Sequence, residues 1–200
     1  LDAAVFYMDV YDQQISKFVS SGLGRVMVNA GRGRSCGTEI GLRGGWLDNR
    51  LTWHASYGYT HSVFKRYEAQ EARTETAQEA VNYDGNHVPF VPMHTLAAGV
   101  EYEQLLEPHK IKSYFFGVNT TGAGKIYWSE DNAFHQPFYA LLNAHAGLDF
   151  GSVRIDIWGK NLTDTDYDAF FFTSAATTRN LKFGQRGNPL QFGVDVSLHF

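Results

Sequence analysis

The C-terminal stretch Leu190-Gln191-Phe192-Gly193-Val194-Asp195-Val196-Ser197-Leu198-His199-Phe200 alternates apolar residues with polar residues or glycine, without exception. Side chains of a strand point alternately to opposite faces, so this period of two predicts a strand with one apolar and one polar face. The same alternation recurs upstream, in residues 51–60, 95–103, 141–150 and 152–160. Strands of this kind are therefore expected along most of the chain.

The connections between the expected strands alternate in length. Segments 2–18, 26–47 and 109–128 are interpreted as strands too, which brings the total to about eight, and no segment predicts a helix. Short connections fall at 48–49, 107–109 and 151–152, whereas long ones fall at 19–25, 67–91, 129–135 and 174–188. Outer-membrane barrels have short periplasmic turns and long extracellular loops, so the alternation favours a transmembrane barrel.

Composition excludes several other classes of protein. The single cysteine, Cys36, leaves no disulfide framework and no multi-cysteine zinc site. A net charge of −4 gives no basic footprint, so no nucleic-acid partner is expected. The sequence has no apolar run long enough for a transmembrane helix, and its mean hydropathy of −0.30 is what alternating strands average to.

Aromatic residues are expected to form two girdles at the membrane interfaces. One set stands near the short connections and comprises Trp46, Trp53, Tyr102, Phe150 and Phe200. The other stands near the long connections and comprises Tyr127, Trp128, Phe138 and Tyr139. The alternative is a soluble all-β domain in which these aromatic residues form the core.

Five segments, in this order along the chain, carry a resemblance to a known family. They are 28–40, with Val28-Asn29-Ala30-Gly31 and Ser35-Cys36-Gly37-Thr38; Tyr57-Gly58-Tyr59-Thr60; 85–95, with Gly85-Asn86-His87-Val88-Pro89; Gly159-Lys160-Asn161-Leu162-Thr163-Asp164; and 187–193, with Gly187-Asn188-Pro189. Together with the aromatic last residue, they resemble the C-terminal barrel of TonB-dependent outer-membrane receptors.

The resemblance implies an all-β fold in which these residues supply about eight C-terminal strands of a 22-stranded antiparallel barrel. It also implies an N-terminal plug domain, absent from this chain, through which the TonB complex supplies energy for importing a scarce ligand. Residues 1–200 are then expected to be the C-terminal portion of the barrel. The chain begins inside a strand at Leu1, without Met or a signal peptide, as a fragment would.

A complete eight-stranded barrel with a structural or adhesive role is the rival interpretation. Such a barrel fills its interior with side chains, yet the expected inward positions carry small residues, among them Ser56, Gly58, Gly99, Gly147 and Ser197. The second strand, up to 22 residues long at 26–47, also exceeds the roughly 9–11 needed to cross a membrane. Both observations favour a piece of a wider barrel.

Signals for catalysis or metal binding are weak. Gly33-Arg34-Ser35-Cys36-Gly37 matches the nucleophile-elbow pattern, but the residues after it continue at period two, so the match lies in a strand. Cys36 is expected to face lipid. No two of the eight histidines have a local metal-ligand spacing. We predict no catalytic residues, no metal and no cofactor; an outer-membrane enzyme such as a phospholipase is the least favoured alternative.

Candidate ligand contacts lie in the long connections, and the small-molecule ligand is expected to be an iron chelate such as a siderophore. The candidates are aromatic, imidazole or cationic side chains: Tyr83, His87, Trp128, His135, Arg179 and Arg186. Cations around the first connection, including Arg32 and Arg34, suit an anionic chelate or the anionic sugar-lipid headgroups of the outer leaflet equally. In residues 67–91, the spacing of Glu71, Glu75 and Glu79 predicts a short helix.

The expected partners follow from this interpretation. They are the lipid of a Gram-negative outer membrane, the TonB complex acting through the plug, the barrel-assembly machinery and the imported ligand. The resemblance implies that Phe200, at the end of the last strand, is read by the assembly machinery. The function expected from the sequence is that of an outer-membrane transport receptor.

Overall fold

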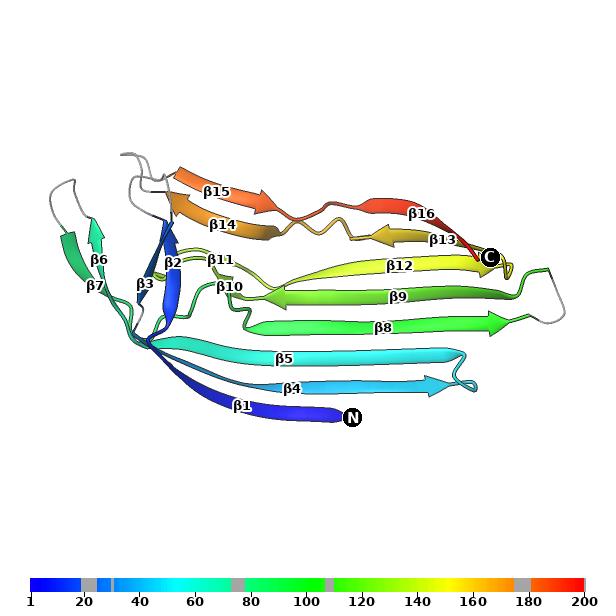
Figure 1. Ribbon diagram of the computed structural model, residues 1–200, viewed down its shortest axis with the longest axis horizontal. Coiled ribbons are helices and arrows are strands. Elements are labelled where there is room, and N and C mark those ends of the chain that lie inside the picture. The colour runs from blue at the N-terminus through cyan, green and yellow to red at the C-terminus, as the bar shows by residue number, and fades with distance from the viewer. Residues whose placement is uncertain (19–24, 30, 73–77, 107–109, 175–180, 200) are drawn as a thin grey trace.

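The computed structural model describes residues 1–18, 25–29, 31–72, 78–106, 110–174 and 181–199, and all regular elements among them are strands. Eight strands form one antiparallel sheet, which we call the wall, in the order β1-β4-β5-β8-β9-β12-β13-β16 (Figure 1). Their bounds are β1 Asp2–Tyr11, β4 Arg32–Trp46, β5 Leu51–Arg66, β8 His94–Leu105, β9 Ser113–Gly124, β12 Tyr139–Asp149, β13 Val153–Lys160 and β16 Gln191–Leu198. The expected all-β fold with about eight barrel strands is confirmed.

Each long connection contains a two-stranded hairpin of its own. The hairpins pair β2 (Gln14–Phe18) with β3 (Arg25–Asn29), β6 (Glu68–Ala72) with β7 (Gln78–Asn82), β10 (Ile126–Tyr127) with β11 (His135–Gln136), and β14 (Asp168–Ser174) with β15 (Leu181–Arg186). All four lie at one end of the wall, which we call the hairpin end (Figure 1). The predicted alternation of short and long connections is confirmed, although the short connection expected at 107–109 lies outside the described residues.

Three predicted strands are in fact divided. The segment 109–128 contains β9, which ends at Gly124, and β10, which pairs with β11 outside the wall. The other two segments are divided by bends. The segment 2–18 breaks at Asp12, which has a positive φ of 52°, and the segment 26–47 breaks beside Gly31, with φ 66°. A Cβ atom on Gly31 would collide with the backbone carbonyl of Arg66, so glycine is required at this position. The prediction of one strand up to 22 residues long is therefore wrong, because β4 has 15 residues and β3 forms a separate hairpin with β2.

The helix predicted from the glutamate spacing in 67–91 is also wrong. Glu71 and Glu79 are register partners across the β6–β7 hairpin, and Glu75 lies outside the described residues. Like charges four residues apart destabilise a helix. Apolar residues at period two flank the hairpin instead, and Ala69, Val81 and Tyr83 pack at its base. This apolar period, rather than the glutamate spacing, agrees with the observed structure.

The strand register gives the wall an apolar face and a polar face. Val100, Val118 and Ala144 lie side by side on the apolar face, and the rows beside them hold Phe116, Ile157, Val194 and Val196. Val100 is 48% exposed, Val118 46% and Val196 61%. An exposed apolar surface of this extent is typical of contact with lipid.

Cys36 lies on the apolar face, in register with Tyr7 and His61, which agrees with the phase predicted for β4. The nucleophile-elbow match around Cys36 lies within β4, as the sequence indicated, and not at a strand-to-helix turn. No helix in the described part of the chain is long and apolar enough to cross a membrane.

Buried side chains gather at the hairpin end. Phe64 is fully buried and contacts Tyr67, with ring centroids 4.8 Å apart, and Tyr67 in turn contacts Tyr83 at 5.4 Å. Backbone hydrogen bonds join these segments, because Tyr83 N–H donates to the Tyr67 carbonyl and Phe64 N–H to the Asn86 carbonyl. The connection between β5 and β8 therefore has a small core that fixes it against the wall.

Candidate functional site

A cluster of rings surrounds Tyr127 of β10 at the hairpin end of the wall. The His87 ring stacks on the Tyr127 ring with centroids 4.9 Å apart and planes 7° from parallel. His135 of β11 contacts the same ring at 5.6 Å, and Lys125 Nζ lies 4.8 Å from its centroid. We call these four residues the Tyr127 cluster. The structure thus brings two of the predicted ligand contacts, His87 and His135, onto one aromatic ring.

Hydrogen bonds from a neighbouring loop fix His87 in place. Its backbone N–H donates to Asn132 Oδ1, and its carbonyl accepts from Asn132 Nδ2. Burial, and next the nearby His61, lower the pKa of the His87 imidazole below its usual value of 6.5. A neutral imidazole presents both an acceptor nitrogen and an apolar ring face, so His87 is suited to contacts with an aromatic or polar ligand.

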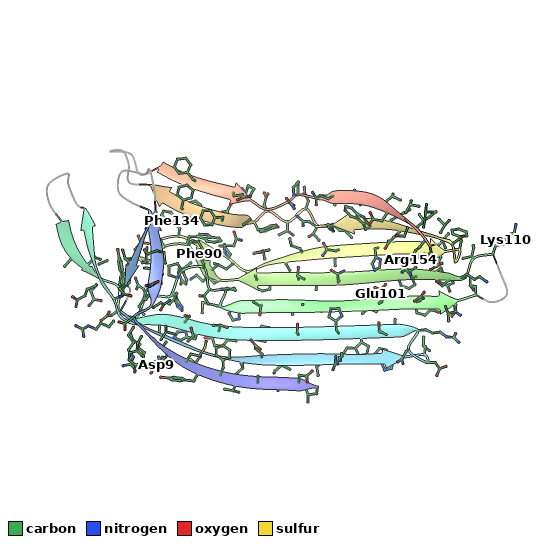
Figure 2. All side chains as sticks on the ribbon, viewed as in Figure 1. Asp9, Phe90, Glu101, Lys110, Phe134 and Arg154 are labelled. Atoms are coloured by element: carbon green, nitrogen blue, oxygen red, sulfur yellow. The ribbon has the colours of Figure 1, made fainter. Side chains whose placement is uncertain are left out.

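A second group of rings lies beside the Tyr127 cluster. Trp128 is 8% exposed and contacts Phe90 and Phe170, with ring centroids 5.7 and 6.5 Å away, and Phe90 stacks on Phe170. Trp128 therefore packs against other rings, so the expectation that it stands at the lipid interface is wrong. Phe90 remains 50% exposed, and Figure 2 shows it with Phe134 near the hairpins. Its ring is the accessible part of this group.

The other predicted ligand contacts have different surroundings. Tyr83 is 5% exposed within the small core, so its burial disfavours a direct ligand contact. Arg186 is largely exposed and lies 3.5 Å from Asp168 and 3.8 Å from Asp166, so its charge is already partly balanced. Arg179 and Phe200 lie outside the described residues.

The polar face of the wall carries a chain of ionic contacts. His145 of β12 bridges two carboxylates, with Nε2 3.0 Å from Glu101 Oε2 and Nδ1 3.2 Å from Asp156 Oδ2. A Cβ atom on Gly117 would collide with Glu101 and His145, so the glycine leaves room for their contact. Figure 2 shows Glu101 and Arg154 in the half of the wall farther from the hairpins. The alternation of residues 141–150 predicts that His145 lies on the polar face, but no local pattern indicates these two partners.

Amide side chains and a tyrosine pair continue this face toward the hairpins. Asn143 Nδ2 donates to Asn119 Oδ1 at 2.9 Å, and Asn143 Oδ1 accepts from the Asn161 backbone N–H. Tyr139 and Tyr167 stack with centroids 4.3 Å apart. Among the described residues, no group of His, Cys, Asp or Glu side chains is arranged to hold a metal ion. The contacts available on this face are hydrogen bonds, charges and ring faces.

Sequence reasoning missed part of the Tyr127 cluster. Lys125 was not considered, and Tyr127 was expected only in an interfacial girdle. The run Lys125-Ile126-Tyr127 alternates at period two, and this alternation is the local signal that a lysine and a tyrosine share one side of a strand. The approach of His87, about forty residues earlier in the chain, depends on strand pairing and has no local signal.

Comparison with known proteins gives consistent matches. The family model described as "TonB dependent receptor-like, beta-barrel" matches residues 1–162. The solved ferric yersiniabactin uptake receptor FyuA from Yersinia pestis is 21% identical, with a TM-score of 0.74, over 99% of this chain and 27% of that one.

Two further receptor structures match in the same way. The siderophore receptor PiuA from Acinetobacter baumannii is 19% identical, with a TM-score of 0.69, over 97% of this chain and 25% of that one. The ferric-catecholate import receptor Fiu from E. coli K12 is 18% identical, with a TM-score of 0.65, over 99% and 25%. This chain therefore spans about a quarter of the length of these structures, and at such identities they show a shared fold.

Proposed function

The chain belongs to the TonB-dependent receptor-like β-barrel family, and on that premise we propose that it forms part of an outer-membrane transporter that imports an iron chelate. The family is one of transport receptors. Our proposal places the protein in the outer membrane of a Gram-negative bacterium, with the hairpin end outside the cell. Residues 1–200 then supply eight strands of a wider barrel, and a plug domain outside this chain receives energy from TonB.

The observation that carries the proposal is the Tyr127 cluster on the long connections of a wall with one apolar face. The apolar face supports membrane insertion, since lipid is the environment in which side chains such as Val118 and Val196 are favourably placed. The cluster offers the exposed His135 imidazole and a cation at the end where an extracellular ligand arrives. The bridge between Val63 and His87 and the His61–His87 ring contact at 5.3 Å place the His87 ring on the outer side of the wall. An iron chelate brings its own iron ligands, so the receptor needs aromatic and cationic contacts rather than a metal site.

The choice of an iron chelate rests on the related structures. One is an uptake receptor for ferric yersiniabactin, one a siderophore receptor and one a ferric-catecholate import receptor. Catecholates are aromatic and anionic, which suits the Tyr127 ring, the imidazoles of His87 and His135, and the Lys125 ammonium. This chemical match supports a catecholate or another anionic aryl chelate as the ligand.

Uptake and binding measured on the full-length receptor test the proposal. We expect purified protein to bind a ferric catecholate, with quenching of its intrinsic fluorescence, and cells to accumulate the iron only when TonB is present. Lys125→Ala combined with His87→Ala should weaken binding at least tenfold, because a charge-assisted contact and a stacked ring are lost. Lys110→Ala is the matched control, because Lys110 lies at the opposite end of the wall (Figure 2).

Three results would contradict the proposal. Uptake that persists without TonB would exclude an energised receptor. Binding that is unchanged in the Lys125 and His87 double variant would remove the Tyr127 cluster from the ligand site. If residues 1–200 alone fold into a heat-modifiable protein, and cells that carry the protein take up no iron chelate, the small complete barrel would be supported instead.

A further inference from the structure

A basic cleft lies on the outside of the wall and shares no residue with the Tyr127 cluster, although the bridge between Val63 and His87 puts His87 in the same row as Asp9 and Arg34. It has a volume of about 820 Å³ and lies where β1, β4 and β5 reach the hairpin end. Four cations line it, together with two acidic side chains and two tyrosines: Arg32, Arg34, Lys65 and Arg66, with Asp9 and Asp12, and Tyr7 and Tyr11. Nothing in the proposed transport function uses this cleft.

The register places the cleft on the apolar, lipid-facing side of the wall. Tyr7, Cys36 and His61 share one row of that face, and Asp9 and Arg34 share the next row of the same face toward the hairpins. Figure 2 shows Asp9 at the hairpin end, where β1 curves away, and far from Lys110. The cleft therefore opens to the membrane side and not to the polar face.

Strand length sets the depth of the cleft in the membrane. Trp46 lies at the opposite interface. The residues of β4 that share its face, from Gly44 back along the strand to Cys36, are uncharged. Ten residues at about 3.4 Å each, on a strand tilted about 40°, rise roughly 26 Å, which is the height of the apolar band of an outer-membrane barrel. Arg34 and Arg32 come directly after this band, at the level of the outer-leaflet headgroups.

The cations of the cleft are incompletely paired. Arg32 Nη2 bonds Asp9 Oδ2 at 2.7 Å, and the Arg32 guanidinium lies 4.7 Å from the centroid of Tyr11. Among the described residues, Arg34, Lys65 and Arg66 have no ion-pair partner, and Arg32 and Arg66 face each other across β4 and β5. Like charges opposite each other on neighbouring strands are destabilising. An anion bound between them would remove that repulsion.

Unpaired donors point to a ligand with several acceptor oxygens. The Nε atoms of Arg32 and Arg34 are shielded from water and make no hydrogen bond, which is costly for a polar donor. A phosphate group accepts hydrogen bonds from arginine in pairs and carries the required negative charge. Asp9 and Asp12 also line the cleft; Asp9 Oδ2 is held by Arg32, whereas Asp9 Oδ1 is likewise shielded from water and makes no hydrogen bond.

We propose that the basic cleft binds the phosphate of an anionic sugar lipid in the outer leaflet, with Arg34 and Arg66 as the main phosphate contacts. The inference rests on the proposed placement in the outer membrane. The tyrosine rings of Tyr7 and Tyr11 lie against the boundary between acyl chains and headgroup, where tyrosine is favoured. The site takes a membrane component from the side, and its cations are different from the Lys125 cation of the Tyr127 cluster.

The test compares lipid binding by full-length receptor variants in nanodiscs. The probes are the phosphorylated outer-leaflet sugar lipid, the same lipid with its phosphates removed, and inorganic phosphate alone. Arg34→Gln with Arg66→Gln should lower the affinity for the phosphorylated lipid at least tenfold and leave that for the dephosphorylated lipid unchanged. Arg43→Gln with Lys110→Gln is the control of equal charge, because both residues lie outside the cleft.

Several outcomes would overturn the inference. Equal binding of both lipids by the wild type would exclude phosphate recognition, and loss of lipid binding in the control pair would show a general charge effect. Displacement of the lipid by millimolar inorganic phosphate would assign the cleft to a free anion. Folding is checked by heat-modifiability on gels. Iron uptake by the Arg34 and Arg66 variant should be unchanged, which separates failure of this inference from failure of the transport proposal.

Discussion

Replacing Val118 by arginine tests the assignment of the apolar face most directly. Val118 lies four residues along β9 from Tyr114, whose ring contacts that of Tyr102 near the end of the wall away from the hairpins. Four residues at about 3.4 Å, tilted about 40°, place Val118 roughly 10 Å inside the apolar band, close to the midplane of a band about 25 Å tall. Arginine at this depth costs about 2–4 kcal/mol, or roughly 30-fold to 900-fold in the folding equilibrium.

The assay is the amount of folded, heat-modifiable receptor in the outer-membrane fraction, together with the denaturant midpoint of the full-length protein in lipid vesicles. Thr121→Arg is the matched control, because Thr121 is an exposed residue of the same strand on the polar face. We expect Val118→Arg to lower both quantities and Thr121→Arg to leave them near wild type. Equal tolerance of both variants, or greater damage from Thr121→Arg, would refute the assignment of the two faces.

Three further predictions concern other parts of the chain. Gly117→Ala should destabilise the folded receptor by about 1–3 kcal/mol in chemical denaturation, since its Cβ would displace the Glu101–His145 contact, whereas Gly41→Ala, with neighbours at 3.9 Å, should be neutral. Phe200→Asp should impair membrane insertion, and unchanged outer-membrane levels would count against Phe200 as an assembly signal. Burial lowers the pKa of His87 in the folded protein, so the unfolded chain binds a proton at His87 more readily than the folded protein does. The stability of the folded protein should therefore fall as the pH drops below about 6.5. His87→Gln should abolish that part of the pH dependence, measured by hydrogen exchange.

The wall was predictable because the information that specifies it is local. Each strand carries its own alternation, and one phase error would exchange its two faces. The observed register of β12, β13 and β16 places the predicted apolar residues together, as with Ala146, Ile157 and Val194, which lie in one row. The turn at 48–49 was equally predictable from the sequence. Asp48 and Asn49 both adopt positive φ angles, a conformation that asparagine and aspartate tolerate.

The hairpin end was less predictable because its contacts are not local. An aromatic residue in a long connection has the same local sequence whether its ring is exposed or buried. Tyr83 and Trp128 were both proposed as ligand contacts, yet both are nearly buried, by Tyr67 in one case and by Phe90 and Phe170 in the other. Strand pairing decides which connections pack together, and it joins residues that are far apart in the sequence. The periodicity of a single segment carries no information about such pairing.

A register shift in β5 explains how the basic cleft and the buried core around Phe64 can both form at the hairpin end. Gly33 pairs with Phe64, but Arg32 pairs with Arg66, so Lys65 is an extra residue that forms a β-bulge. A bulge redirects the side chains that follow it. Without the bulge, Lys65 would be opposite Arg32, and alternation would send Arg66 to the face that Phe64 occupies in the core. With it, two consecutive cations reach the basic cleft while Phe64 stays fully buried. One inserted residue thus supplies charge to the lipid-facing side without disturbing the core that anchors the extracellular connection.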